Sequence, residues 1–83
     1  MVKNRQVPSL FEPALYQICI VGYLDTSWSN YCGGMLIKQV KDTKFNAMTI
    51  LAGRLIDQSA LIGVLNSLHD IGYPIISVEC ITP

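Results

Sequence analysis

The sequence predicts a single small domain of the α+β class, on three observations. Its 83 residues are 51% hydrophobic and 14% charged, which suits one domain with its own core. Four short runs are rich in β-branched and aromatic residues, which favour strands. One segment near the C-terminus instead repeats its apolar residues at the spacing of an amphipathic helix.

The N-terminal stretch, residues 1–13, is expected to be a flexible arm. It is mostly polar, and Pro8 and Pro13 exclude a continuous helix or strand ladder. The folded domain is therefore expected over residues 14–83.

Three cysteines, Cys19, Cys32 and Cys80, show neither the pairing of a disulfide framework nor the spacing of a zinc site. They indicate a reducing cytoplasm as the location of the protein. A signal peptide is not expected, because Glu12 and Gln17 interrupt the first apolar run and no small-residue cleavage site follows. No run approaches the roughly 18 apolar residues that a membrane span needs.

The first predicted strand is residues 15–24, LYQICIVGYL, which is nearly apolar on both faces and should lie centrally in a sheet. Residues 35–40 and 47–55 are expected to form two further strands. The polar segment between them, residues 41–46, has the composition of a hairpin loop, so these two strands should pair antiparallel.

The predicted helix spans residues 57–73. Asp57 can accept hydrogen bonds from the amides of the first turn, and Gly72 and Pro74 end the helix. The apolar stripe that should lie on the sheet comprises Leu61, Val64, Leu65, Leu68 and Ile71. Residues 74–81 follow as the fourth strand.

The segment between the first two strands, residues 25–34, decides the topology. Asp25, Thr26 or Ser27 can cap a short helix, and the glycine pair 33–34 can end one. A helix here gives a ferredoxin-like βαββαβ sandwich with a short first helix. A loop here gives the alternative, a three-stranded meander followed by a helix and a strand.

Residues 22–79 contain the pattern G-x-L-D-x-x-W-S and, later, the pattern G-x-x-x-D-Q-x-A-L-x-G-x-L-x-x-L-x-D-x-G-x-P-x-x-S-V. In both patterns the chain resembles a family of uncharacterised small bacterial proteins found in cyanobacteria and actinobacteria. The resemblance implies a bacterial protein with these domain boundaries, and the family has no assigned activity. The positions that carry the resemblance are Gly22, Leu24, Asp25, Trp28, Ser29, Asp57, Gln58, Ala60, Leu61, Gly63, Gly72, Pro74 and Ser77.

The C-terminal part of the chain is also similar to the second half of ACT-type regulatory modules. In those modules an amphipathic helix and the strand after it lie beside a small-ligand site between subunits. The glycine-rich turn with which such modules meet their ligand is replaced here by RLIDQ, residues 54–58.

Composition argues against several partners and cofactors. Six basic and six acidic residues balance to zero net charge and are scattered along the chain, so neither nucleic acid nor an anionic membrane is expected as a partner. No spacing typical of a metal site or of a phosphate-binding loop occurs, and no metal or cofactor is expected.

Five residues form a candidate binding site for a small molecule or a partner. Trp28 and Tyr31 could stack on a planar ligand, and Asp25, Asp57 and Gln58 would add polar groups. The corresponding hypothesis is an ACT-like regulatory domain with a pocket between subunits, near Trp28 and the start of the long helix.

A further alternative is a small enzyme that uses Cys32 or His69. Cys32 precedes a glycine pair, where a thiol could act as a nucleophile. The sole histidine, His69, is expected on the polar side of the helix, and Asp70 beside it faces another direction. We therefore interpret both as structural or solvated residues and predict no catalytic residue.

Alternate strand positions predict two unlike sheet faces. The face expected under the helix collects Ile18, Ile20, Met48, Ile50, Ile76 and Val78. The other face collects Gln17, Cys19, Val21, Tyr23, Thr49, Leu51, Ser77 and Glu79. This second face is too apolar to stay in water, and one long helix with a short one cannot cover it. The main prediction is therefore a cytoplasmic homo-oligomer, a dimer or higher, that acts as an interaction or regulatory module without catalysis, with Cys19, Val21, Tyr23 and Leu51 in its interface.

Overall fold

The structure is a computed structural model that describes residues 12–82 of the chain. Its elements, in chain order, are β1 (Ala14–Val21), the 3-10 helix η1 (Thr26–Cys32), β2 (Leu36–Asp42), β3 (Asn46–Leu55), α1 (Gln58–Asp70) and β4 (Ile75–Thr82). Every strand predicted from the sequence is present, with ends displaced by a few residues. The arm predicted for residues 1–13 lies almost wholly outside the described residues.

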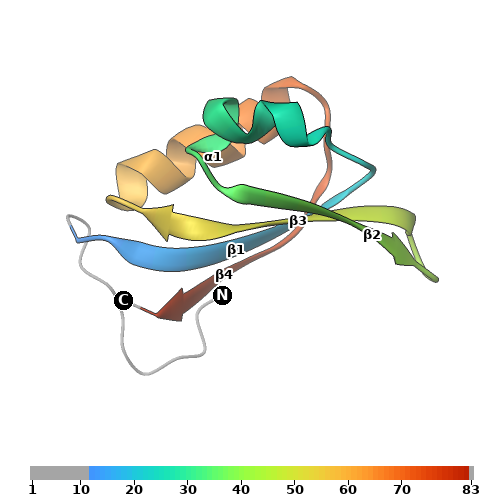
Figure 1. Cartoon of the computed structure of the whole chain (residues 1–83), viewed down its shortest axis with the longest axis horizontal. Coiled ribbons are helices and arrows are strands. Elements are labelled where there is room, and N and C mark those ends of the chain that lie inside the picture. Colours follow the sequence, from blue (N-terminus) through green and yellow to red (C-terminus); the bar gives the residue numbers. More distant parts are fainter. Residues whose placement is uncertain (1–11, 83) are drawn as a thin grey trace.

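The four strands form one antiparallel sheet in the order β2-β3-β1-β4. β1 lies inside the sheet, as predicted, and pairs with β3 on one side and β4 on the other. Both helices lie above this sheet, on the same side (Figure 1). The α+β class is therefore confirmed. The meander alternative is wrong, because it requires β1 to pair with β2, and β3 lies between them.

The connection from β1 to β2 is neither an α-helix nor a loop but a 3-10 helix of seven residues. It begins at the cap Asp25, whose carboxylate accepts a hydrogen bond from the Ser27 amide at 2.9 Å, and it ends at Gly33 with a left-handed φ of 68°. This connection must carry the chain back along the sheet, because β2 runs parallel to β1. A 3-10 helix rises about 2.0 Å per residue, against about 1.5 Å for an α-helix. The tighter helix therefore spans more of the sheet with few residues.

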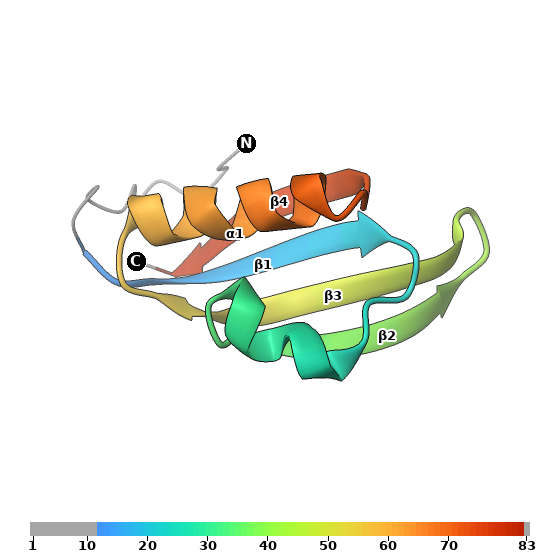
Figure 2. The ribbon, with the colours of Figure 1, turned by 90° about the horizontal axis from the view of Figure 1, so that it is seen from above.

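The long helix α1 begins after the predicted cap Asp57 and ends at Asp70, three residues before the predicted end. The Asp57 carboxylate accepts a hydrogen bond from the Ala60 amide at 2.8 Å. After the helix, the Tyr73 amide donates to the Leu68 carbonyl at 3.0 Å, and Gly72 has a φ of 92°, which glycine adopts without strain. Figure 2 shows α1 and η1 side by side over the sheet.

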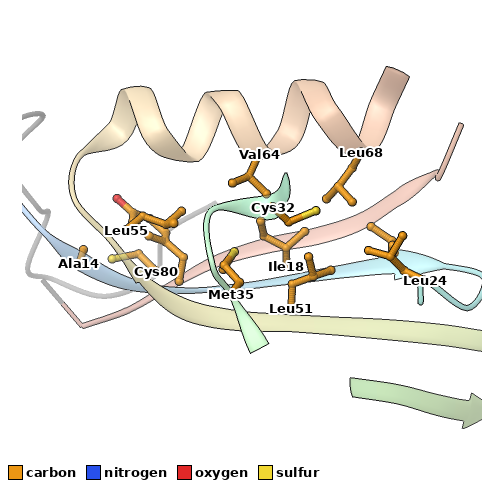
Figure 3. Packing of buried hydrophobic residues seen from close by; sticks show 12 residues of the cluster. Ala14, Ile18, Leu24, Cys32, Met35, Leu51, Leu55, Val64, Leu68 and Cys80 are labelled. Atoms are coloured by element: carbon orange, nitrogen blue, oxygen red, sulfur yellow. The ribbon is translucent and has the colours of Figure 1, made fainter. Parts of the chain in front are cut away.

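The core lies between the helices and the sheet. Val64 and Leu68 of α1 are buried, and the rest of the predicted helical stripe is half-buried against them. Figure 3 shows how these side chains meet those of the sheet and of η1. The buried hydrophobic residues are Ala14, Tyr16, Ile18, Ile20, Leu24, Cys32, Met35, Leu51, Leu55, Val64, Leu68 and Cys80.

The faces of β3 are the reverse of those predicted. Leu51 pairs with Ile18 and is fully buried on the helix side, whereas Met48 and Ile50 point away from the helices. Gly53 lies on the helix side with Leu51, and a Cβ atom there would come within 3.2 Å of the Met35 Cα. A glycine facing inward therefore suits the close approach of these two backbones, and it is consistent with the faces observed for this strand.

The faces at the start of β4, just after α1 in the chain, also differ from the prediction. Ile76 is 36% exposed rather than covered by the helix. The register between β1 and β4 shifts here, so that Cys19 pairs with Ser77 while Ile20 pairs with Ile75. Ile76 is the additional residue of this irregularity, and the alternation of faces fails at that point.

Thr49 is the buried polar residue that joins β3 to the start of the crossover. Its hydroxyl donates to the Gly22 carbonyl at 2.6 Å and accepts from the Leu24 amide at 2.9 Å, and the residue is 0% exposed. Both backbone groups belong to the bend that leaves β1, where Gly22 has a φ of 99°. The side chain therefore satisfies backbone groups that no neighbouring strand reaches.

Replacing Thr49 by valine keeps the shape of the side chain and removes its hydroxyl. Because the Gly22 carbonyl and the Leu24 amide would then lose this partner, we expect Thr49→Val to lower the free energy of unfolding by about 1–3 kcal/mol in urea denaturation. Thr43→Val, the same change in the exposed hairpin loop, should have little effect. Equal stability of the two variants would contradict the role of the hydroxyl.

Candidate functional site

The sheet face opposite the two helices, called the open face below, is not covered by any described residue (Figure 1). It consists of the strand side chains that alternate with the core side chains. Its apolar members are Leu15, Cys19, Val21, Leu36, Val40, Met48, Ile50 and Ala52. An uncovered sheet face this apolar is the most distinctive surface of the described chain.

The middle of the open face is a continuous apolar strip on the two interior strands. Cys19 lies directly opposite Ile50, and Val21 lies directly opposite Met48. All four are half-buried by their neighbours on the sheet rather than by any covering layer. Their neighbour on the edge strand β2 is Val40, which is opposite Met48. The strip therefore runs over three strands.

Charged groups of the open face lie at its periphery. Lys38 is opposite Ile50 on the edge strand β2, and Glu79 is opposite Gln17 on the edge strand β4. Both charged residues are exposed, as is Arg54 near the end of β3. Asp42 also lies on this face, at the hairpin end of β2, where its carboxylate accepts hydrogen bonds from the Lys44 and Phe45 amides. The open face is thus apolar in the middle, and the exposed charges that flank this middle are Lys38 at one edge and Glu79 at the other.

The four residues predicted for an oligomer interface separate in the structure. Cys19 and Val21 lie on the open face. Leu51 does not, because the faces of β3 are reversed, and its side chain is buried in the core. Tyr23 lies beyond the end of β1 and is 46% exposed, and its carbonyl accepts a hydrogen bond from the Tyr73 hydroxyl at 3.0 Å.

A second surface feature is an aromatic pair on η1. Trp28 and Tyr31 are 38% and 54% exposed, and their rings meet edge to face with centroids 5.3 Å apart. Asp25 caps the same helix, and the hydrogen bonds that Ser27 donates to it lower the pKa of its carboxyl group. Cys32, at the other end of η1, is buried and anchors the helix in the core. The aromatic rings are thereby presented outward on a fixed support.

The other two candidate binding residues lie elsewhere. β1 and β3 are antiparallel, so Asp25 follows one end of the sheet and Asp57 follows the opposite end. Gln58 lies near the Tyr16 hydroxyl, which is buried and lacks a hydrogen-bond partner among the described residues. Burial is the main reason that the pKa of Tyr16 is raised. Asp25 and Asp57 therefore do not converge on one site.

The two residues considered for catalysis, Cys32 and His69, differ in burial. Cys32 is fully buried, and this burial raises the pKa of its thiol. A nucleophilic cysteine requires the opposite shift, since the thiolate is the reactive form. His69 is exposed in the last turn of α1.

Within residues 12–82, no cluster of three or more histidine, cysteine, aspartate or glutamate side chains could hold a metal ion. The same part of the chain contains no ligand-sized pocket. None of its helices is long and apolar enough to cross a bilayer.

One family model matches most of the residues that form this fold. Residues 15–79 match DUF8691, a domain of unknown function, and this match is more than half of the 83-residue chain. The chain belongs to this family. Comparisons with curated proteins and with solved structures gave no match. The matched segment begins in β1 and ends in β4, so the DUF8691 domain includes every element described above.

Met48 and Ile50 of this DUF8691 domain were predicted to face the core, but they form the middle of the open face. The signal that could have placed them was Gly53, because a glycine inside a strand often marks a close backbone approach and hence the inner face. No local sequence signal marks Lys38, because its edge position follows only from the strand order.

The burial of Cys32 predicts low reactivity. The test uses a variant with Cys19→Ser and Cys80→Ser, so that Cys32 is its one remaining thiol. At neutral pH we expect iodoacetamide to alkylate Cys32 at least about tenfold more slowly in the folded variant than in the variant unfolded by urea, because folding shields the thiol and raises its pKa. The rate is measured by intact mass. Alkylation of the folded variant faster than that of the unfolded one would instead indicate an activated thiol.

Proposed function

We propose that this protein is a small interaction or regulatory module without catalysis that acts by associating with a second copy of itself through the open face. The observation that carries the proposal is the apolar strip in the middle of that face. Cys19, Val21, Met48 and Ile50 lie adjacent on two interior strands, with no described residue above them. Antiparallel sheets that face water normally present polar side chains on that side.

A second copy is the partner best suited to such a strip. Two sheets stack face to face about 10 Å apart, and their side chains interdigitate to form an apolar layer. A symmetric dimer uses the same patch twice, so the strip of one copy is matched by the strip of the other. Burying apolar surface contributes about 25 cal/mol per Å², which makes association favourable.

The surroundings of the two candidate catalytic residues support a function without catalysis. Cys32 is buried with a raised pKa, and His69 is exposed in the last turn of α1. A cytoplasmic location is supported by the three cysteines, all of which are free. The resemblance to bacterial proteins supports a bacterial source.

We extend the proposal to the fold. The connection from β1 to β2 passes over β3, and the connection from β3 to β4 passes over β1. These two crossovers support a ferredoxin-like sandwich whose first helix is reduced to η1.

The mass of the protein in solution tests this association. We expect multi-angle light scattering to give a dimer at micromolar concentration. Ile50→Glu should shift the protein to a folded monomer, because it puts a charge in the middle of the apolar layer, while Lys38 opposite can pair with that charge within the monomer.

The matched control is Ile62→Glu, the same change on the outward side of α1, where the isoleucine is 56% exposed. It should leave the dimer intact. Cys19 reports on the face that is covered, because its alkylation should slow as protein concentration rises through the dissociation constant. A wild-type protein that is monomeric at all accessible concentrations would exclude this function.

A second candidate function, binding of a planar small molecule, is favoured by the aromatic pair on η1. Trp28 and Tyr31 are exposed side by side and held by a helix that is anchored in the core. Exposed rings of this kind stack on flat ligands.

A thermal-shift screen against planar metabolites tests this candidate. We expect at least one compound to raise the melting temperature in a saturable manner, and Trp28→Ala to abolish the rise. Phe45→Ala, which removes another partly exposed ring in the hairpin loop, is the control and should leave the rise unchanged. If no compound shifts the wild-type protein, the aromatic pair has no such role.

A further inference from the structure

We infer that the two copies stack with their symmetry axis parallel to the strands, so that Lys38 of each copy meets Glu79 of the partner subunit. The inference rests on the proposed function, because it specifies the orientation of the dimer that the proposal requires. Its basis is the placement of charge at the two edges of the open face.

The two charges lie on opposite edge strands. The sheet order β2-β3-β1-β4 puts Lys38 at one edge and Glu79 at the other. Along the strands they are close to level. Lys38 shares a row of opposed residues with Ile50, Cys19 and Ser77, and Glu79 is two residues from Ser77. Two residues of a strand span about 7 Å.

A two-fold axis that runs along the strands, in the plane between the sheets, places β2 of one copy over β4 of the other. Lys38 then lies over the row of Ser77, one row from Glu79 of the partner subunit. The sheets are about 10 Å apart, and both side chains are long and flexible enough to meet across this gap at the solvent-exposed rim. The symmetry produces the pair twice, once at each edge.

The same axis also matches the apolar strip to itself. It places β3 of one copy over β1 of the other, so Ile50 stacks on the row of Cys19 and Met48 stacks on the row of Val21. The layer between the sheets is therefore apolar in its middle, and the ion pairs close its two sides. This is the usual distribution of apolar and polar groups in a protein interface.

A two-fold axis across the strands gives the opposite result. It places each edge strand over its own copy, so that lysine approaches lysine at one rim and glutamate approaches glutamate at the other. Like charges brought together in this way are unfavourable. The apolar strip alone would accept both orientations, and the edge charges distinguish them.

Single and double charge reversals test the orientation. We expect Lys38→Glu and Glu79→Lys each to raise the dissociation constant of the dimer by about tenfold, because each replaces two attractive pairs by two repulsive ones. The double variant, with both substitutions, should return to the wild-type value because the pairs are restored with reversed signs. Sedimentation velocity over a concentration series measures the three constants.

Lys41→Glu, a reversal at an exposed position of the same edge strand that alternates to the helix side of the sheet, is the control and should change the dissociation constant by less than about threefold. High salt should reduce the effects of the single variants, since exposed ion pairs are screened. Circular dichroism verifies that each variant is folded, which is expected because both residues are exposed.

The outcomes separate this inference from the proposed function. If the protein is a dimer with Cys19 protected but neither single reversal weakens it, the orientation is overturned and the proposed function stands. If the protein is a dimer in which Cys19 remains freely reactive, the copies join through another surface, and both proposals are overturned. A monomer in which Cys19 is protected would assign the open face to another segment of the same chain and would also overturn both.

Discussion

The two hydrogen bonds of the Thr49 hydroxyl are the interaction on which the rest of this structure depends. They hold the Gly22 carbonyl and the Leu24 amide at the bend where the chain leaves β1. The bend directs η1 onto the same side of the sheet as α1. Because Thr49 must point inward to make these bonds, its neighbours Met48 and Ile50 must point outward. A single buried hydroxyl thereby links the path of the crossover to the composition of the opposite face.

That link explains how a chain of this size comes to have an apolar open face. β1 and β3 form the interior of the sheet and carry apolar residues on both sides. Alternate side chains of β3 face opposite sides of the sheet. Thr49 and Gly53 belong to the set that faces the helices, whereas Met48 and Ile50 belong to the set that faces out. The chain therefore spends two of its large apolar side chains on the open face. In the proposed dimer these two side chains would face a second sheet rather than water.

The elements of this fold were predictable from the sequence to the extent that local chemistry determines them. Asp57 as a helix cap, Gly33 as the end of η1 and the polar hairpin loop are all local signals, and each is confirmed. The faces of β3 were not predictable by alternation, because both alternate sets are apolar and a one-residue change reverses them. For the candidate site, Cys19 and Val21 were placed on the open face correctly, whereas Leu51 was not, for the same reason. The separation of Asp25 from Asp57 is a consequence of the antiparallel pairing of β1 with β3, which no local pattern encodes.

The division of the open face into an apolar middle and charged edges has a further consequence for specificity. Apolar contact is not directional, so the strip of Val21, Met48 and Ile50 would accept sheets stacked in several orientations. Exposed ion pairs add little affinity, but like charges that meet at a rim disfavour the wrong orientations. Lys38 and Glu79 are separated by the full width of the sheet, the arrangement in which one pair of charges discriminates best between the two possible symmetry axes. The apolar strip would then supply most of the affinity, and the edge charges would select the orientation by penalising the alternative.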